Sequence, residues 1–126
     1  VLAKAKEGVY NSYSVRHVPD YYMRKYFKKE SGERFVISPE VKKLVTFQHL
    51  NLYDDNKMIF MKTFDFIFCA NVLIYFDMAS KSKVVQHFYN NLQPYGYFFV
   101  GQSESLHGVN DKFKTVHFPG GFAYKK

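Results

Sequence analysis

Two amide side chains follow predicted strands of this chain, and they are the first candidates for binding chemistry. Asn71 comes after the apolar run Phe64–Ala70, and Asn51 comes after Leu44–Leu50. An amide at the end of a strand can hydrogen-bond a ligand, and it can equally cap the next turn. The spacing leaves both alternatives open at both positions.

Three further side chains carry groups that can do chemistry. Glu104, just past Gly101, can cap a helix or work at a site. Tyr75 lies between apolar neighbours, where most tyrosines are core rings with a hydrogen-bonded hydroxyl. Cys69 ends an apolar run with no base evident beside it, which favours a buried inert thiol over a nucleophile.

The sequence contains no motif for a metal site and none for a nucleotide-binding loop. The single cysteine excludes an intramolecular disulfide and zinc sites built from several thiolates, and it favours a reducing compartment. No glycine-rich phosphate loop occurs. We predict no metal site and expect each histidine to be a surface or core side chain: His17, His49, His87, His107 and His117.

The second half of the chain predicts a β-α-β unit. Phe64–Ala70 is typical of a strand buried on both faces, as in a parallel sheet covered by helices. Asp77 suits the N-cap of a helix, and Tyr97–Val100 is the next apolar strand. Pro94 and Gly96 should stop the helix before that strand. The helix carries one apolar stripe: Val84, Val85, Phe88, Tyr89 and Leu92.

The remaining elements are short. The tail predicts a closing hairpin of strands 113–118 and 122–125. The first half predicts a helix end at 1–7, an irregular stretch at 9–18, a helix from Pro19-Asp20 to about Phe27, strands at Arg34–Ile37 and Leu44–Leu50, and a polar loop at 53–63. The fold class is α/β, and its ligands should bind beyond the carboxyl ends of the parallel strands.

Length and composition set the outer limits. The 126 residues suffice for one domain, and 47% are hydrophobic, so a core can form. No run approaches the roughly 18–20 apolar residues of a membrane span. The net charge of +7 is spread along the chain, and a solvated surface explains it better than a nucleic-acid track. The chain does not begin with Met, so we expect a fragment or a processed chain.

The segment from Phe64 to Asp77 closely resembles the signature F-D-x-I-F-C-R-N-V-x-I-Y-F-D of the CheR-type chemoreceptor methyltransferases. Other segments agree with that family in order and spacing. They are Val1–Ala5 with Gly8–Tyr10, Arg24–Phe27, Val45–Phe47 with Asn51-Leu52, Leu92–Gly96, and Gly101–Leu106. The resemblance covers essentially the whole chain.

The resemblance implies a fold and a site. Residues 1–126 would be the C-terminal portion of a Rossmann-like S-adenosylmethionine methyltransferase sheet, with a small antiparallel β insertion at 28–50 and a terminal β-hairpin. Asn51, Leu52 and Asn71 match cofactor contacts. Ala70 occupies a further cofactor-contact position, and Tyr75 matches a tyrosine close to the transferred methyl.

The resemblance also implies an activity. The full-length parent would transfer a methyl group from S-adenosylmethionine to receptor glutamates in the cytoplasm and release S-adenosylhomocysteine. Its partner would be the cytoplasmic part of a chemoreceptor, in some family members held by a C-terminal peptide tether through strand addition. Neither nucleic acid nor membrane insertion is expected.

Two departures from the family pattern bear on activity. Ala70 stands where the family has Arg, and Tyr95 replaces the first glycine of a Gly-Gly pair. The family's receptor-binding helical domain and glycine-rich cofactor loop would lie before Val1, so we expect this chain alone to be inactive and to self-associate through an exposed sheet edge. The alternatives are a degenerate cofactor- or receptor-binding module and, from charge alone, an RNA-binding relative.

Overall fold

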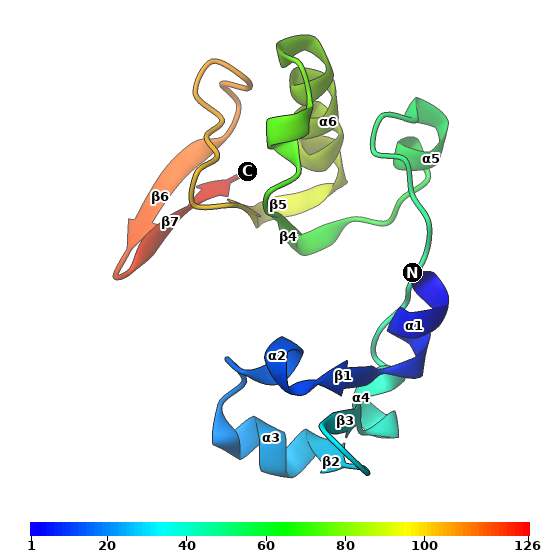
Figure 1. The fold of residues 1–126 in the computed structure, drawn as a ribbon. Helices are drawn as coiled ribbons and strands as arrows, with labels where there is room; N and C mark the ends of the chain where they lie inside the picture. The colour runs from blue at the N-terminus through cyan, green and yellow to red at the C-terminus, as the bar shows by residue number, and fades with distance from the viewer. The chain divides into compact units, whose positions relative to one another are not determined.

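All 126 residues are described by the computed structural model, which divides them into two compact units, Val1–His49 and Leu50–Lys126 (Figure 1). Each unit contains one β-sheet, three-stranded in the first and four-stranded in the second. The chain is therefore a mixed α/β protein, as the sequence predicts. None of its helices is both long and apolar enough to cross a membrane.

The first unit is built around a small antiparallel sheet. Its elements are α1 (Leu2–Glu7), β1 (Val9–Asn11), α2 (Ser12–Val15), α3 (Asp20–Tyr26), β2 (Phe27–Lys29), β3 (Arg34–Ile37) and α4 (Pro39–Lys42). Strand β3 lies in the centre and pairs antiparallel with β1 on one side and β2 on the other. Both β1 and β2 are therefore edge strands.

Local signals explain how the first unit begins. Gly8 ends α1 in the left-handed conformation at φ 66°, which favours glycine. The Asn11 side chain then accepts a hydrogen bond of 2.9 Å from the Ser14 N–H and caps α2. The predicted helix after Pro19 and the predicted strand Arg34–Ile37 are confirmed. The prediction of an irregular 9–18 stretch was wrong, because a three-residue strand and a single helical turn are too short to show a period.

The predicted strand Leu44–Leu50 does not form. These residues belong to neither sheet, and Leu44 is 84% exposed. A strand needs a neighbour to satisfy its backbone N–H and C=O groups, and no strand of the structure lies beside this segment. Alternation of apolar and polar residues is therefore not sufficient to form a strand at Leu44–Leu50.

The second unit is a mixed sheet of four strands in the order β4-β5-β7-β6. Its elements are α5 (Asp55–Ile59), β4 (Phe64–Cys69), the 3₁₀ turn η1 (Leu73–Tyr75), α6 (Met78–Asn91), β5 (Leu92–Val100), β6 (Lys114–Phe118) and β7 (Gly121–Lys125). Strands β4 and β5 are parallel and joined through α6, and β7 and β6 complete an antiparallel edge. The predicted β-α-β unit and closing hairpin are confirmed, whereas α5 replaces part of the expected 53–63 loop.

Helix α6 supplies the core of this unit. Asp77 caps it by accepting a hydrogen bond of 2.7 Å from the Ser80 N–H. The predicted apolar stripe is confirmed at four positions, Val84, Val85, Phe88 and Tyr89, whereas Leu92 belongs to β5 because the helix ends at Asn91. Val84 and Val85 are fully buried in the same core cluster as Phe98 of β5. Burial of that apolar area is the main stabilising contribution to the unit.

The opposite face of the sheet is exposed, which corrects the prediction of a strand buried on both sides. Phe66 and Phe68 of β4 are 57% and 74% exposed, although they stack with Tyr97 and Phe99 of the adjoining strand. Side chains alternate between the two faces of a strand, and no helix of this unit buries the face that carries these rings. The other edge of β4 is also unpaired.

The junction between α6 and β5 contains a strained residue. The helix ends at Asn91, and the ladder is irregular, because Phe64 pairs with Leu92 while Phe66 pairs with Tyr97. Tyr95 lies within this bulge at φ 67°, a left-handed conformation that costs an L residue with a bulky side chain about 1–2 kcal/mol. The residue is 76% exposed, and the centre of its ring lies 5.3 Å from Lys125 Nζ.

Replacing Tyr95 by glycine is expected to raise the free energy of unfolding by about 1 kcal/mol, because glycine adopts this conformation without a Cβ clash. Chemical denaturation measures it. Gly108 is the matched control: it has φ 69° and open space around it, so Gly108→Ala should lower stability by a similar amount. Equal stability of the two variants would contradict the assignment of strain to the backbone.

Candidate functional site

A buried carboxylate shapes the loop at the carboxyl end of the parallel strand pair. Glu104 follows β5, and its Oε2 accepts hydrogen bonds from the N–H groups of Asn71, at 2.7 Å, and Gly101, at 2.9 Å. Its Oε1 accepts two more, each at 3.2 Å, from the N–H groups of Val72 and Ile74. One side chain thus satisfies backbone donors from the ends of both parallel strands.

The charge of Glu104 is stabilised by these donors. The side chain is 6% exposed, and burial alone would oppose ionisation. The backbone N–H groups, led by those of Gly101 and Asn71, outweigh that effect and hold the pKa of Glu104 below its ordinary value of 4.5. The carboxylate is consequently ionised at neutral pH and acts as an acceptor only. The sequence left open a helix cap or a role at a site for Glu104, and the structure shows a cap on the backbone of a loop rather than on a regular helix.

Gly101 allows the two strand ends to approach each other. A Cβ at this position would lie 2.8 Å from Glu104 Oε2 and 3.1 Å from both the backbone nitrogen and the Oδ1 of Asn71. Such distances leave no room for a side chain, so glycine is required by close approach. The carboxyl ends of β4 and β5 therefore lie next to each other at one edge of the sheet.

The loop held by Glu104 presents three of the predicted site residues. Ala70 and Asn71 follow β4 directly, both are exposed, and Asn71 adopts φ 59°, which asparagine tolerates better than most residues. Tyr75 ends η1 and is 83% exposed, so the alternative of a buried core ring is wrong. Its hydroxyl lies at the surface, at the edge where α/β sheets bind ligands.

The other two predicted residues, Asn51 and Leu52, lie in the loop before α5. The Asn51 side chain accepts a hydrogen bond of 3.1 Å from the Tyr53 N–H, which caps its own turn. Leu52 is half-buried and packs against the same core cluster that contains Leu73 of η1. The common core is the link between this loop and the one that follows β4.

A polar cluster between α5 and α6 holds the loop before α5, and no local sequence pattern indicates it. His87 is 8% exposed, its Nδ1 lies 2.9 Å from the carbonyl oxygen of Leu52, and its Nε2 lies 2.9 Å from Asp55 Oδ1. Lys83 bonds the other oxygen of Asp55 at 2.7 Å. Hydrogen bonds from Lys83 and then His87 lower the pKa of Asp55. The contacts join residues about thirty positions apart, so no local pattern could have revealed them.

Cys69 is a buried thiol, as predicted. Burial raises its pKa to about 11, and the nearby charge of Glu104 adds to the rise. Thiolate is the reactive form, so this side chain is inert at neutral pH.

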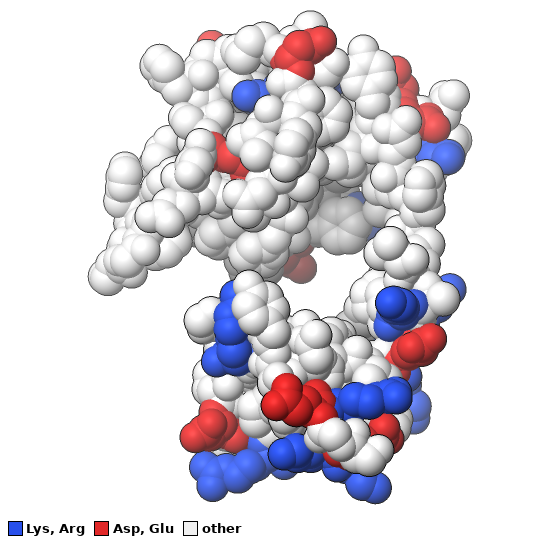
Figure 2. Space-filling model, viewed as in Figure 1, with Lys and Arg blue, Asp and Glu red and all other residues white.

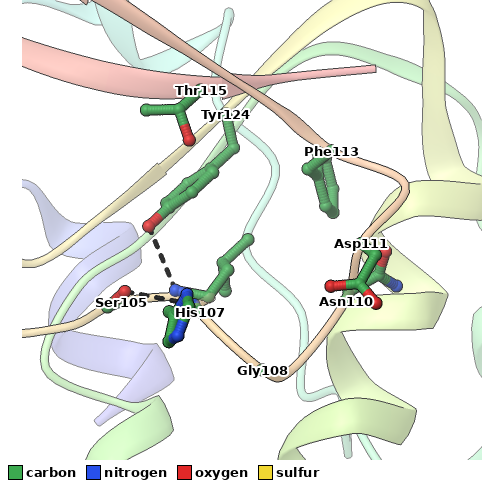
Figure 3. A pocket seen from close by; sticks show the side chains of 9 residues that line it. Ser105, His107, Gly108, Asn110, Asp111, Phe113, Thr115 and Tyr124 are labelled. Carbon is green, nitrogen blue, oxygen red and sulfur yellow. Dashed lines mark hydrogen bonds between the residues drawn. The ribbon is translucent and has the colours of Figure 1, made fainter.

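A small cavity lies beside the loop that follows β5 (Figure 3). Its volume is about 260 Å³, and its lining includes Ser105, His107, Asp111 and Thr115. Tyr124 of β7 points into this region, where its hydroxyl accepts a hydrogen bond of 3.0 Å from the Leu106 N–H. This bond anchors the segment next to Glu104 to the closing hairpin.

The electrostatic character of the chain differs between the units. Val1–His49 has ten basic and five acidic side chains, so +5 of the net +7 belongs to it, and the charge is less evenly spread than we expected from the sequence. Lys and Arg crowd the visible face of this unit in Figure 2. No cluster of three or more His, Cys, Asp or Glu side chains is placed to hold a metal ion.

The site and the fold agree with the family comparison. The family model described as "CheR methyltransferase, SAM binding domain" matches residues 1–122. The chain therefore belongs to the CheR methyltransferase family, and S-adenosylmethionine is the cofactor of that domain.

Several curated relatives are named chemotaxis protein methyltransferases. A chemotaxis protein methyltransferase of Vibrio parahaemolyticus is 39% identical over 99% of this chain and 45% of its own length. Proteins of that name from Borreliella burgdorferi and Pseudomonas aeruginosa are 37% and 32% identical, over 86% and 99% of this chain and 38% and 45% of their own lengths. The chain thus spans less than half the length of these relatives.

Replacing Glu104 by glutamine should destabilise the protein by about 2–3 kcal/mol, because four hydrogen bonds lose their charged acceptor. Thermal and chemical unfolding measure the loss. Asp111→Asn on the same loop is the control, since this carboxylate is exposed, and it should stay within about 0.5 kcal/mol of the parent.

The same carboxylate should give the protein an acid-sensitive component of stability. Its pKa is lowered by folding, so its contribution is complete above the unfolded-state value near 4.5 and is lost as the pH falls through the folded-state value. The stability difference between the parent and Glu104→Gln should therefore shrink below about pH 4.5. A difference independent of pH would show that ionisation of Glu104 is not involved.

Cys69 should not react with a thiol reagent at pH 8 until the protein unfolds, because its thiol is buried and its pKa is about 11. Absorbance of the released thiol product, with and without denaturant, measures this. Full reaction under native conditions would contradict the burial of the side chain.

Proposed function

We propose that this chain is the C-terminal part of the catalytic domain of a protein-glutamate O-methyltransferase that modifies chemoreceptors. The observation that carries the proposal is the Glu104-held loop, which presents Asn71 and Tyr75 at the carboxyl end of two parallel strands. The family assignment and the names of the relatives support it.

The chemistry requires positioning more than acid–base catalysis. A glutamate carboxylate is already ionised at neutral pH and can attack without a general base. Bound S-adenosylmethionine supplies a methyl group on a sulfonium centre, and displacement yields a methyl ester and S-adenosylhomocysteine. The protein's tasks are to align the carboxylate with that carbon and to exclude water.

The proposal assigns a role to each site residue. Asn51, Leu52, Asn71 and the Ala70 backbone would contact the cofactor, and Tyr75 would lie near the transferred methyl and orient the reacting groups through its hydroxyl. The donor set fits a cofactor with an adenosine part, because exposed amides can pair with base and ribose groups and need no metal.

The antiparallel sheet of the first unit is the proposed contact for a receptor tether. Strand β3 and most of β2 fall within residues 28–50, the segment that resembles the family's β insertion, whereas β1 lies before it. Both β1 and β2 have an unpaired edge. An extended peptide can add to such an edge by main-chain hydrogen bonds. The basic surface of this unit would suit an acidic peptide. A cytoplasmic location follows from this partner.

Ala70 favours a second candidate function. The family motif has Arg at this position, whereas this chain presents an exposed methyl group that can bind neither the cofactor nor an acidic substrate through charge. The second candidate is a module that binds the cofactor or a receptor segment without transferring methyl. The RNA-binding alternative rests on charge alone, and absence of RNA binding at low salt would remove it.

The deciding experiment uses the full-length parent protein, radioactive S-adenosylmethionine and a purified receptor fragment. An active enzyme labels receptor glutamates while it carries Ala70, and the label is released by alkali as expected for a methyl ester. Activity that appears only in Ala70→Arg would support the binding module. A parent that fails to label the receptor both with Ala70 and with Ala70→Arg would refute methyl transfer.

Tyr75→Phe should lower kcat of the parent about tenfold, the effect of one lost orienting hydrogen bond, and leave binding of S-adenosylhomocysteine nearly unchanged. Initial rates and calorimetry measure the two quantities. Tyr95→Phe is the control, because that hydroxyl is exposed and distant in sequence from the loop. Equal rates for both variants would remove Tyr75 from the mechanism.

Self-association of the isolated chain is also proposed, through the exposed aromatic face and free edge of β4. Sedimentation velocity at increasing concentration tests it. A sharp monomer at high concentration would rule it out.

A further inference from the structure

His87 is in a position that constrains its protonation state. Both ring nitrogens lie 2.9 Å from an oxygen, Nδ1 from the carbonyl of Leu52 and Nε2 from Asp55 Oδ1. A backbone carbonyl can only accept a hydrogen bond, and so can an ionised carboxylate. A neutral imidazole has one N–H and satisfies only one of these oxygens, whereas an imidazolium satisfies both.

The neighbouring side chains keep Asp55 ionised, so it can only accept hydrogen bonds. Lys83, one helical turn before His87 on α6, bonds Asp55 Oδ2 at 2.7 Å, and the lowered pKa of Asp55 keeps it ionised. Lys83 also lies 4.0 Å from the centre of the Tyr53 ring. Asp54 is the remaining charged group at this end of α5, and it pairs with Lys57 at 3.8 Å. Asp55 therefore has two partners on α6, the ammonium group of Lys83 at Oδ2 and the His87 ring at Oδ1.

The two bonds of His87 fix the loop from Leu52 to Asp55 against α6. The ring is 8% exposed, so water cannot easily replace a lost partner. The Leu52 carbonyl is part of the segment Asn51-Leu52, to which the proposed function assigns a cofactor contact. We propose that His87, as an imidazolium, is the positioning residue that holds this segment in its binding conformation, so that cofactor affinity falls when His87 loses its proton.

The inference rests on the proposed function, because it takes Asn51-Leu52 as a cofactor contact. It goes beyond that function in two ways: His87 acts on the cofactor site without touching the cofactor, and cofactor affinity depends on pH. A neutral His87 retains one hydrogen bond and leaves one acceptor unpaired.

The test measures binding of S-adenosylhomocysteine to the full-length parent by calorimetry from about pH 5.5 to about pH 8.5. Kd should rise about tenfold across this range, the effect of one hydrogen bond to a charged group. His87→Gln should bind about tenfold more weakly at low pH and lose most of the pH dependence. His87→Arg supplies two donors that do not titrate, so it should retain affinity and bind independently of pH.

A second readout needs no cofactor. Nitrogen-15 NMR of labelled histidine should show both ring nitrogens of His87 protonated at low pH. Hydrogen exchange at the amides of residues 51–55, corrected for intrinsic rates, should show protection that declines as pH rises in the parent but not in His87→Arg. The matched control is His107→Gln, whose exposed side chain lies elsewhere in this unit and should leave both readouts unchanged.

The outcomes separate the proposed role of His87 from the proposed cofactor contact of Asn51-Leu52. The inference is overturned if the pH dependence of Kd in His87→Gln equals that of the parent, or if His87 stays neutral while the loop remains protected. Absence of cofactor binding in every variant at every pH, with the exchange response of the loop intact, would instead refute the proposed cofactor contact.

Discussion

The bonds between Glu104 and the backbone of the loop after β4 are the interaction on which the candidate site depends. A turn at the end of a parallel strand leaves several N–H groups without a ladder partner, and burying them unpaired would cost about 1–3 kcal/mol each. The carboxylate of Glu104 satisfies three of them, together with the N–H of Gly101 after β5, and is itself held ionised by these donors. The exposed positions of Asn71 and Tyr75 follow from this arrangement.

Helix α6 connects that loop to the rest of the proposed site. Its apolar stripe buries one face of the sheet, and its cap at Asp77 fixes where the helix begins after η1. Its polar residue His87 reaches the loop before α5. One element thus provides packing for the core and a hydrogen-bonding partner for a loop that is far away in sequence. A displacement of α6 would change both parts of the site together.

The patterns that predicted structure correctly were those with a local cause. The α6 stripe, the Asp77 cap and the hairpin depend on side chains a few residues apart, and all three form. Leu44–Leu50 and the burial of Phe66 were predicted wrongly for one reason. A strand pattern indicates which residues can be covered, but a neighbouring element must be present to cover them. Leu44–Leu50 has no strand beside it, and no helix covers the face of β4 that carries Phe66.

The sequence by itself determined the family and the candidate residues, because the motif from Phe64 to Asp77 is long and its order is specific. It left two roles open for Glu104 and treated His87 as an ordinary histidine. The tertiary structure decided both. Glu104 meets backbone donors about thirty residues earlier, and His87 meets two acceptors about as far away. Hydrogen bonds depend on distance in space, and only the folded chain sets that distance.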